Sequence, residues 1–131
     1  MSGHWLLKTE PSTYSWDNLA REKTTTWDGV SNPVALRHVA AMKPGDDALI
    51  YHTGAEKAVV GLARVTRAAY AAAGADNPKL LVVDIEAVRQ LPRAIPLAEI
   101  KADALFADSP LVRQGRLSVV PLTDEQFGRL A

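Results

Sequence analysis

The sequence contains no cysteine, and this absence removes several classes of protein at once. Disulfide-stabilised domains, thiolate metal sites and cysteine nucleophiles all require that residue. The histidines, His4, His38 and His52, lie far apart and follow no His-Glu-x-x-His spacing. We therefore expect neither a bound metal nor a cofactor.

Long apolar segments are also missing. No apolar run approaches the ~18 residues that a membrane span requires, and the short apolar segment near the N-terminus has no signal-peptide cleavage site after it. We therefore expect a cytoplasmic protein with no membrane partner. Walker, G-x-S-x-G and G-x-G-x-x-G motifs are absent too, so nucleotide hydrolysis, acyl transfer and dinucleotide binding lack their usual signatures.

Neither sign of charge is in excess: 15 basic residues balance 15 acidic ones. A protein that binds nucleic acid mainly through bulk charge carries a strongly basic surface, so that class is not expected, whereas binding in a pocket stays open. The length of 131 residues, with 47% hydrophobic and 23% charged residues, is typical of a globular protein. We predict one domain over residues 1–131.

Hydrophobic patterning predicts five strands, at residues 5–7, 48–52, 58–66, 81–88 and 117–120. Helices are predicted at 16–21, 33–42 and 96–101 and after Thr123, with a surface loop at 68–77. Ser15, Asn32 and Thr123 are the expected N-caps, and Pro33 suits a first helical position. Because strands and helices do not alternate regularly, we predict an α+β fold, a mostly antiparallel barrel or curled sheet with helices around it.

The helix at 33–42 is expected to pack a stripe of Leu36, Val39 and Ala40 on that sheet. Trp5 and Trp16 are expected in the core, since tryptophan is mostly buried. Trp27 follows three threonines and lacks apolar periodicity, so we favour a pocket position for it.

Aromatic and hydrogen-bonding residues gather where predicted strands end. A flat aromatic wall with convergent donors and acceptors suits an unstacked nucleobase. The candidate pocket residues are Lys8, Thr9, Glu10, Trp27, Asp28, Asn32, Tyr51 and His52. Simpler roles stay open: Lys8 with Glu10 as a surface ion pair, Asn32 as a helix cap alone, and Tyr51 with His52 as half-buried strand residues.

A basic segment precedes the last predicted strand. Its two arginines, Arg113 and Arg116, have no acidic neighbour between Ser109 and Leu122, so we expect them, with Gln114, at a nucleic-acid-binding rim. The alternative is a solvated surface without a ligand.

Enzymatic alternatives rest on carboxylates. Asp84 with Glu99 and Lys101 loosely matches a metal-dependent nuclease, but residues 96–101 are predicted as a helix, which favours a chance match. Glu10 or Asp28 as a general acid–base on a modified base is a second alternative. With no catalytic motif present, we expect a protein that is not an enzyme.

Several strings occur together in one order along nearly the whole chain. They are Trp5-Leu6-Leu7-Lys8-Thr9-Glu10-Pro11, Tyr14-Ser15-Trp16, Trp27-Asp28-Gly29-Val30-Ser31-Asn32, Tyr51-His52 and Arg113-Gln114-Gly115-Arg116-Leu117-Ser118-Val119. Together they resemble the EVE domain, a PUA-like family related to the YTH and ASCH domains. The resemblance implies a PUA-like mixed-sheet pseudo-barrel with flanking short helices and a pocket for a modified nucleobase.

The resemblance also implies residue roles. Lys8, Thr9 and Glu10 would form one side of the pocket, Trp27 an aromatic wall, and Asn32 and Tyr51 further lining. Arg113 and Gln114 would lie at its rim or floor. Arginine is usual in the family where this chain has Ser31 and Leu36, so fewer phosphate contacts are expected.

EVE domains are associated with modified cytosines in DNA, and YTH domains with N6-methyladenine in RNA. We therefore expect a monomeric module whose partner is nucleic acid containing a modified base, with a modified cytosine in DNA as the first candidate. An RNA-binding module and an enzyme acting on a modified base remain the alternatives.

Overall fold

The computed structural model describes residues 3–28, 30, 32–71 and 80–131, and within them the strands form one mixed six-stranded sheet. The strands are β1 (His4–Thr9), β2 (Thr24–Trp27), β3 (Asp47–His52), β4 (Ala58–Ala71), β5 (Leu81–Pro96) and β6 (Val119–Leu122). Their order is β2-β5-β4-β3-β1-β6. β1 runs parallel to β3, and all other neighbours are antiparallel.

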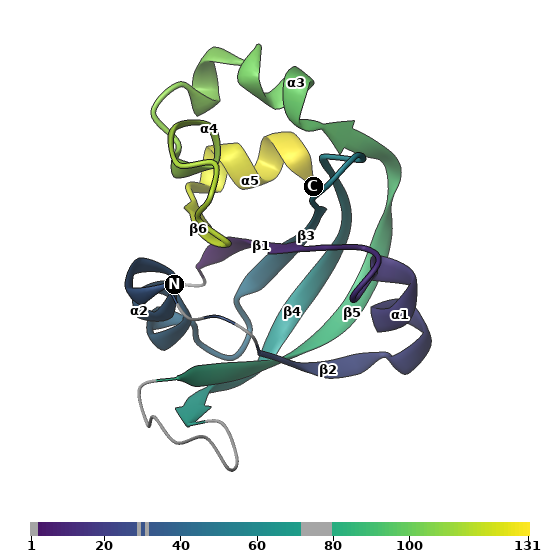
Figure 1. Ribbon diagram of the computed structural model, residues 1–131, viewed down its shortest axis with the longest axis vertical. Helices are drawn as coiled ribbons and strands as arrows, with labels where there is room; N and C mark the ends of the chain where they lie inside the picture. Colours follow the sequence, from purple (N-terminus) through teal and green to yellow (C-terminus); the bar gives the residue numbers. More distant parts are fainter. Residues whose placement is uncertain (1–2, 29, 31, 72–79) are drawn as a thin grey trace.

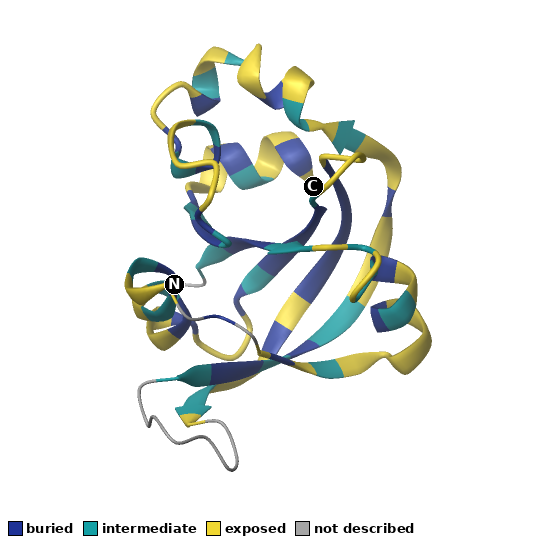
Figure 2. Cartoon of the chain, viewed as in Figure 1, coloured by how far each residue is buried: buried dark blue, intermediate teal, exposed yellow. Residues whose placement is uncertain are grey.

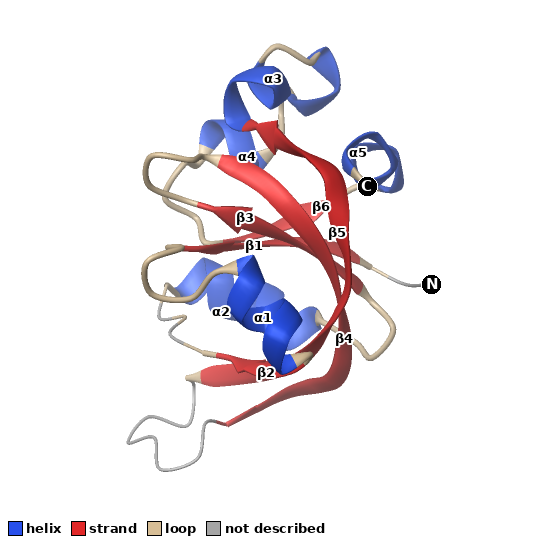
Figure 3. Cartoon of the chain, turned by 90° about the vertical axis from the view of Figure 1, so that its right-hand side faces the viewer, coloured by secondary structure: helices blue, strands red, loops and turns tan. Residues whose placement is uncertain are grey.

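Short helices pack around this sheet. They are α1 (Trp16–Glu22), α2 (Pro33–Ala41), α3 (Leu97–Lys101), the 3-10 turn η1 (Ala104–Phe106), α4 (Pro110–Arg113) and α5 (Asp124–Leu130). The sheet curls, and α1 and α2 lie inside its curve, between β2 and the β1–β3 pair (Figure 3). α3, α4 and α5 gather at one end of the molecule (Figure 1).

The three predicted N-caps are confirmed. The Ser15 hydroxyl accepts a hydrogen bond from the Asn18 backbone N–H at 3.2 Å. The Asn32 side chain accepts from the backbone N–H of Val34 at 2.8 Å, and Thr123 caps α5 in a reciprocal capping box. Each side chain satisfies a donor that has no partner within the helix, which explains why α1, α2 and α5 begin where they do.

The core lies between the curled sheet and the helices, and β1 and β3 supply much of its buried surface (Figure 2). Trp5 and Trp16 belong to it, as expected, with 9% and 4% of their surface exposed. The Trp5 indole Nε1–H donates to the buried carboxylate of Asp46 at 3.0 Å. The polar edge of this tryptophan is therefore satisfied inside the core.

The prediction of five strands is wrong, because β2 was missed. β2 forms the edge of the sheet and pairs only with β5, so its threonines stay half-buried or exposed and show no apolar periodicity. The run Thr24-Thr25-Thr26 nevertheless has the β-branched composition that favours strands.

The bounds of other strands also differ from the prediction. β4 continues to Ala71 and β5 to Pro96, through several register shifts at which the paired strands bend and the simple alternation is lost. Residues 68–71 of the predicted loop therefore belong to a strand, and residues 72–77 lie outside the described part of the chain. The last strand spans Val119–Leu122 instead of 117–120.

Two helical predictions also need correction. On α2 the buried residues are Ala35 and Val39, whereas Leu36 is half-buried and Ala40 exposed. α4 was not predicted, although Ser109 caps it and Pro110 occupies its first position. The same signal had correctly located the start of α2.

Candidate nucleic-acid site

The curl of the sheet brings β1 and β2 to two sides of one cavity. In the sheet itself three strands separate them, so only the curl lets both line the same opening. The cavity has a volume of about 400 Å³, and we call it the first cavity. Its lining residues are Lys8, Thr9, Thr13, Tyr14, Thr25, Thr26, Trp27 and Asp28.

Two aromatic rings meet at this cavity. Trp27 and Tyr14 pack edge to face, with ring centroids 6.1 Å apart and an interplanar angle of 84°. Trp27 is only 8% exposed and belongs to the core while it also lines the cavity. The sequence suggested the core and the pocket as alternative positions for Trp27. The structure shows that Trp27 belongs to both.

Lys8 forms a wall between the first cavity and a neighbouring one, since it lines both. Its Nζ donates to the Gly115 carbonyl at 3.0 Å and lies 5.6 Å from the centroid of the Tyr51 ring. Burial lowers the pKa of this ammonium group from its usual value. No ion pair joins Lys8 to Glu10 within the described residues, so the surface-pair alternative is wrong.

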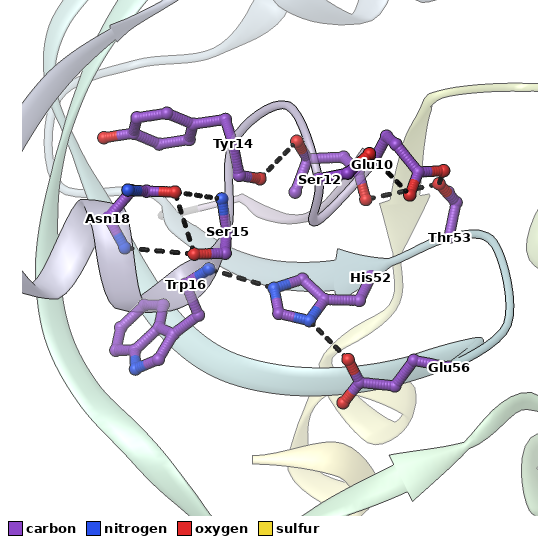
Figure 4. A network of polar contacts seen from close by, with 10 residues as sticks. Glu10, Ser12, Tyr14, Ser15, Trp16, Asn18, His52, Thr53 and Glu56 are labelled. Carbon is purple, nitrogen blue, oxygen red and sulfur yellow. Dashed lines mark hydrogen bonds and ion pairs between the residues drawn. The ribbon is translucent and has the colours of Figure 1, made fainter.

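Glu10 and His52 do not line the first cavity, contrary to prediction; they hold the connection between β1 and α1 (Figure 4). The Glu10 carboxylate accepts from the hydroxyls of Ser12 and Thr53, at 3.3 and 3.2 Å. The buried His52 ring accepts from the Trp16 backbone N–H through Nε2 at 2.9 Å.

The same connection supplies Thr13 and Tyr14 to the cavity lining. The Thr9 hydroxyl donates to the Tyr14 carbonyl at 2.8 Å, which fixes the segment against the end of β1. Glu10, His52 and Thr9 therefore position the lining, and only Thr9 also belongs to it.

Asn32 and Tyr51 lie beside other cavities. Tyr51 lines the neighbouring cavity of about 230 Å³, which we call the second cavity. Asn32 lines a third, of about 350 Å³, and its side-chain oxygen is already used as the cap of α2. The first cavity thus keeps four of the eight predicted pocket residues: Lys8, Thr9, Trp27 and Asp28.

The predicted rim residues Arg113, Gln114 and Arg116 come together in the lining of the third cavity. No acidic residue lies between Ser109 and Leu122 in the sequence, but Arg113 pairs with Asp108, just before that segment, at 2.9 Å, and its Nε donates to the Ala107 carbonyl. Within the part of the chain that the structure describes, Arg116 has no such ion pair.

Sequence reasoning did not assign Thr13, Tyr14, Thr25 and Thr26 to the pocket. Recognition of β2 from its β-branched threonines would have placed two of them beside Trp27. Thr13 and Tyr14 carry no comparable local signal, because their position depends on how the β1–α1 connection folds back.

Over the described residues, no three histidine or acidic side chains are grouped closely enough to hold a metal ion. Within the same ranges, no helix has the length and apolar character to cross a membrane.

Comparison with known proteins gives consistent matches. Residues 3–131 match the EVE domain. Human thymocyte nuclear protein 1 is 33% identical, over 97% of this chain and 72% of the human protein. A solved structure of a Rhodopseudomonas palustris protein is 38% identical with a TM-score of 0.91, covering 98% of this chain and 90% of that chain.

A second solved structure contains nucleic acid. The crystal structure of human THYN1 protein in complex with DNA containing 5-methylcytosine is 33% identical, with a TM-score of 0.88 and coverage of 98% of this chain and 95% of that chain. An ASCH protein from Zymomonas mobilis is only 14% identical, yet its TM-score is 0.59 over 97% of this chain and 92% of that chain. This likeness concerns the fold alone, and it confirms the predicted PUA-like α+β class.

Proposed function

Because the chain belongs to the EVE domain family, we propose that it binds nucleic acid containing a modified base, with a modified cytosine in DNA as the ligand. The observation that carries the proposal is the first cavity, where Trp27 and Tyr14 lie beside a lysine, several threonine hydroxyls and one carboxylate. Its volume falls within the ~300–1,000 Å³ common for small-ligand sites.

The residues that line the first cavity can contact both the face and the edge of a single base. Trp27 and Tyr14 offer apolar surface to the face of an unstacked base, as aromatic residues do in modules that bind unpaired nucleotides. Asp28 offers a carboxylate acceptor, the group that pairs with the N4 amino group of cytosine. The neutral net charge also favours recognition in a pocket over binding through phosphates alone.

DNA is preferred over RNA as the ligand because human THYN1, which shares 33% of its residues with this chain, was crystallised with DNA containing 5-methylcytosine. We further propose that the protein acts by binding and not by catalysis. Glu10, one of the two carboxylates considered as an acid–base, is held by two hydroxyls outside the first cavity.

Equilibrium binding to matched oligonucleotides tests the function. We expect tighter binding to a DNA duplex with one 5-methylcytosine than to the same duplex with cytosine, by up to ~10- to 200-fold for one methyl group. RNA containing N6-methyladenine should bind more weakly. Equal affinity for the two duplexes contradicts the proposal, and tighter RNA binding favours the RNA-directed alternative.

Mass spectrometry of the recovered oligonucleotides completes the test. An unchanged modified base supports a binding module, whereas conversion or release of the base would identify an enzyme.

A further inference from the structure

The second cavity, beside the first, gathers three lysines from distant parts of the sequence. Lys8 comes from β1, Lys57 from the turn between β3 and β4, and Lys101 from the end of α3. The other described lining residues are Tyr51, Thr53, Gly54, Leu97, Leu111, Val112 and Gly115, so no carboxylate is among them. Although the net charge of the chain is zero, the fold thus forms a cavity with a local excess of positive charge.

These lysines are not neutralised by the surrounding protein. None of the three forms an ion pair with another described residue. Lys8 uses one of its three donors on the Gly115 carbonyl, which leaves two for a ligand. The Glu10 carboxylate accepts from the hydroxyls of Ser12 and Thr53, does not line this cavity, and forms no ion pair with the three lysines. Positive charges in one cavity repel one another, and an anion bound between them offsets that repulsion.

Tyr51 supplies an independent sign of a ligand. It is only 3% exposed, and its hydroxyl makes no hydrogen bond with any described residue. Since no fully buried side-chain polar atom in the described chain lacks a partner, this hydroxyl must reach solvent, and Tyr51 lines the second cavity. A phenol is protonated at neutral pH, and burial raises the pKa of Tyr51 further, so the hydroxyl can donate a hydrogen bond to an anion.

The backbone around Lys57 is fixed in an uncommon conformation. Its φ of 45° lies in the left-handed region, which residues with a side chain seldom adopt. The Lys57 carbonyl accepts from the Leu97 N–H at 2.8 Å, and Ala58 pairs with Pro96. The turn that carries Lys57 is therefore attached to the start of the helix that carries Lys101, and the two cations are held on joined segments.

We propose that the second cavity binds a phosphate group, namely the phosphodiester next to the nucleotide whose base enters the first cavity. The assignment of this phosphate to nucleic acid rests on the proposed function. Lys8 lines both cavities, so a chain with its base in the first cavity would present an adjacent phosphate to the second.

Titration with inorganic phosphate, followed by ¹H–¹⁵N NMR, tests the cavity without any nucleic acid. We expect saturable shifts at the amides of Thr53, Gly54, Lys57, Lys101 and Gly115, and their loss in the double variant Lys57→Gln/Lys101→Gln. Lys23 is the matched control: it is also an exposed lysine at positive φ, 71°, but lines none of the three cavities described above. Absent shifts, or equal ones at Lys23, would overturn the proposal.

Binding of the modified duplex at several salt concentrations tests the nucleic-acid assignment. Lys57→Gln and Lys101→Gln should each weaken binding to the 5-methylcytosine and cytosine duplexes by the same factor, and should make the slope of log K against log[salt] shallower by about 1. Lys23→Gln should leave affinity and slope unchanged.

The two proposals fail in different ways. If the wild-type protein does not prefer the methylated duplex, the proposed function fails, while the phosphate titration still decides whether the cavity binds phosphate. If the preference is present but the lysine variants keep the wild-type slope, the phosphate inference is overturned and the function stands.

Discussion

The indole ring of Trp16 lies directly on the backbone of Gly61. A Cβ added to Gly61 would come within 2.4 Å of Trp16 Cδ2 and Cε3, closer than packed atoms allow. Trp16 begins α1 and Gly61 lies in β4, so this contact docks the helix on the sheet. The absence of a side chain at Gly61 is thus a packing requirement imposed by a residue 45 positions earlier in the chain.

The first prediction follows from that contact. Gly61→Ala should lower the free energy of unfolding by about 1–3 kcal/mol, because the added methyl group overpacks the core. Gly128→Ala is the matched control: Gly128 lies in α5 with no atom within 4 Å of an added Cβ, so alanine there should stabilise by about 0.5–1 kcal/mol. Urea denaturation measures both, and destabilisation of equal size would contradict the packing argument.

The second prediction concerns Trp27, which is buried and also lines the first cavity. Trp27→Ala should lower the free energy of unfolding by ~3–5 kcal/mol, as cavity formation in a core does, so it is a poor test of binding. Trp27→Phe keeps an aromatic face and should stay folded while it weakens binding to the methylated duplex. Trp16→Phe, which leaves the first cavity intact, should cost stability without changing affinity.

The third prediction concerns Asp28, the only carboxylate among the described residues that line the first cavity. If it accepts from the N4 amino group of cytosine, Asp28→Asn should reduce the preference for a cytosine derivative by about 1–3 kcal/mol. Asp17→Asn, an exposed carboxylate on α1, is the control and should leave the preference unchanged. Competition binding with duplexes that differ only in the base at the modified position measures the ratio of their affinities directly.

The fourth prediction is a pH dependence at Asp46. Burial alone would raise the pKa of this carboxyl group, but hydrogen bonds from the Trp5 indole and from the backbone N–H groups of Gly3 and Lys43 outweigh burial and lower it below its ordinary 3.8. The folded state therefore favours the ionised form. The resulting stabilisation is complete above pH ~4 and is lost as pH falls through the lower folded pKa.

Asp46→Asn tests this linkage. It should lower the free energy of unfolding by about 1–3 kcal/mol near neutral pH, and the difference from the wild-type protein should shrink as the solution becomes acidic. Asp17→Asn, which removes an exposed carboxylate from α1, controls for the loss of one charge. A difference from the wild-type protein that stays constant down to pH ~2 would show that Asp46 is not linked to folding through its ionisation.

The fifth prediction concerns the tautomer of His52. Its Nε2 accepts from the Trp16 N–H, so the proton of the neutral ring must be on Nδ1, which lies 2.7 Å from Glu56 Oε1. Long-range ¹H–¹⁵N NMR should therefore show the Nδ1–H tautomer. His52→Leu should lower the free energy of unfolding by about 1–3 kcal/mol because it leaves the Trp16 N–H without a partner. The Nε2–H tautomer would contradict the arrangement.

Much of the local structure was predictable because its causes lie within a few residues of each other. Ser15, Asn32 and Thr123 cap their helices through atoms two or three positions away. The edge strand β2 escaped prediction because an edge position removes the burial that makes a strand periodic. Its threonines report strand propensity, but not which strand they pair with.

The candidate site was predicted only in part. The residue types at strand ends could be read locally, whereas the cavity that each residue lines could not. The first cavity is lined by Lys8, Thr9, Trp27 and Asp28. Glu10 and His52 instead hold the β1–α1 connection. Asn32 and Tyr51 line other cavities. All eight lie near strand or helix ends, where side chains often reach a site, so sequence could nominate them as a group. Which cavity each one reaches depends on strand order and curl.

The sequence was sufficient to predict the starts of α1, α2 and α5, most of the strands, the balanced charge and the family resemblance, because each depends on composition, on neighbouring residues or on a motif. By contrast, the lack of space for a side chain at Gly61 and the shared cavity of Lys8, Lys57 and Lys101 depend on the tertiary structure. The curl of one sheet around α1 and α2 sets the distances between residues that are far apart in the chain. Those distances are set by packing of the whole core and by no local pattern.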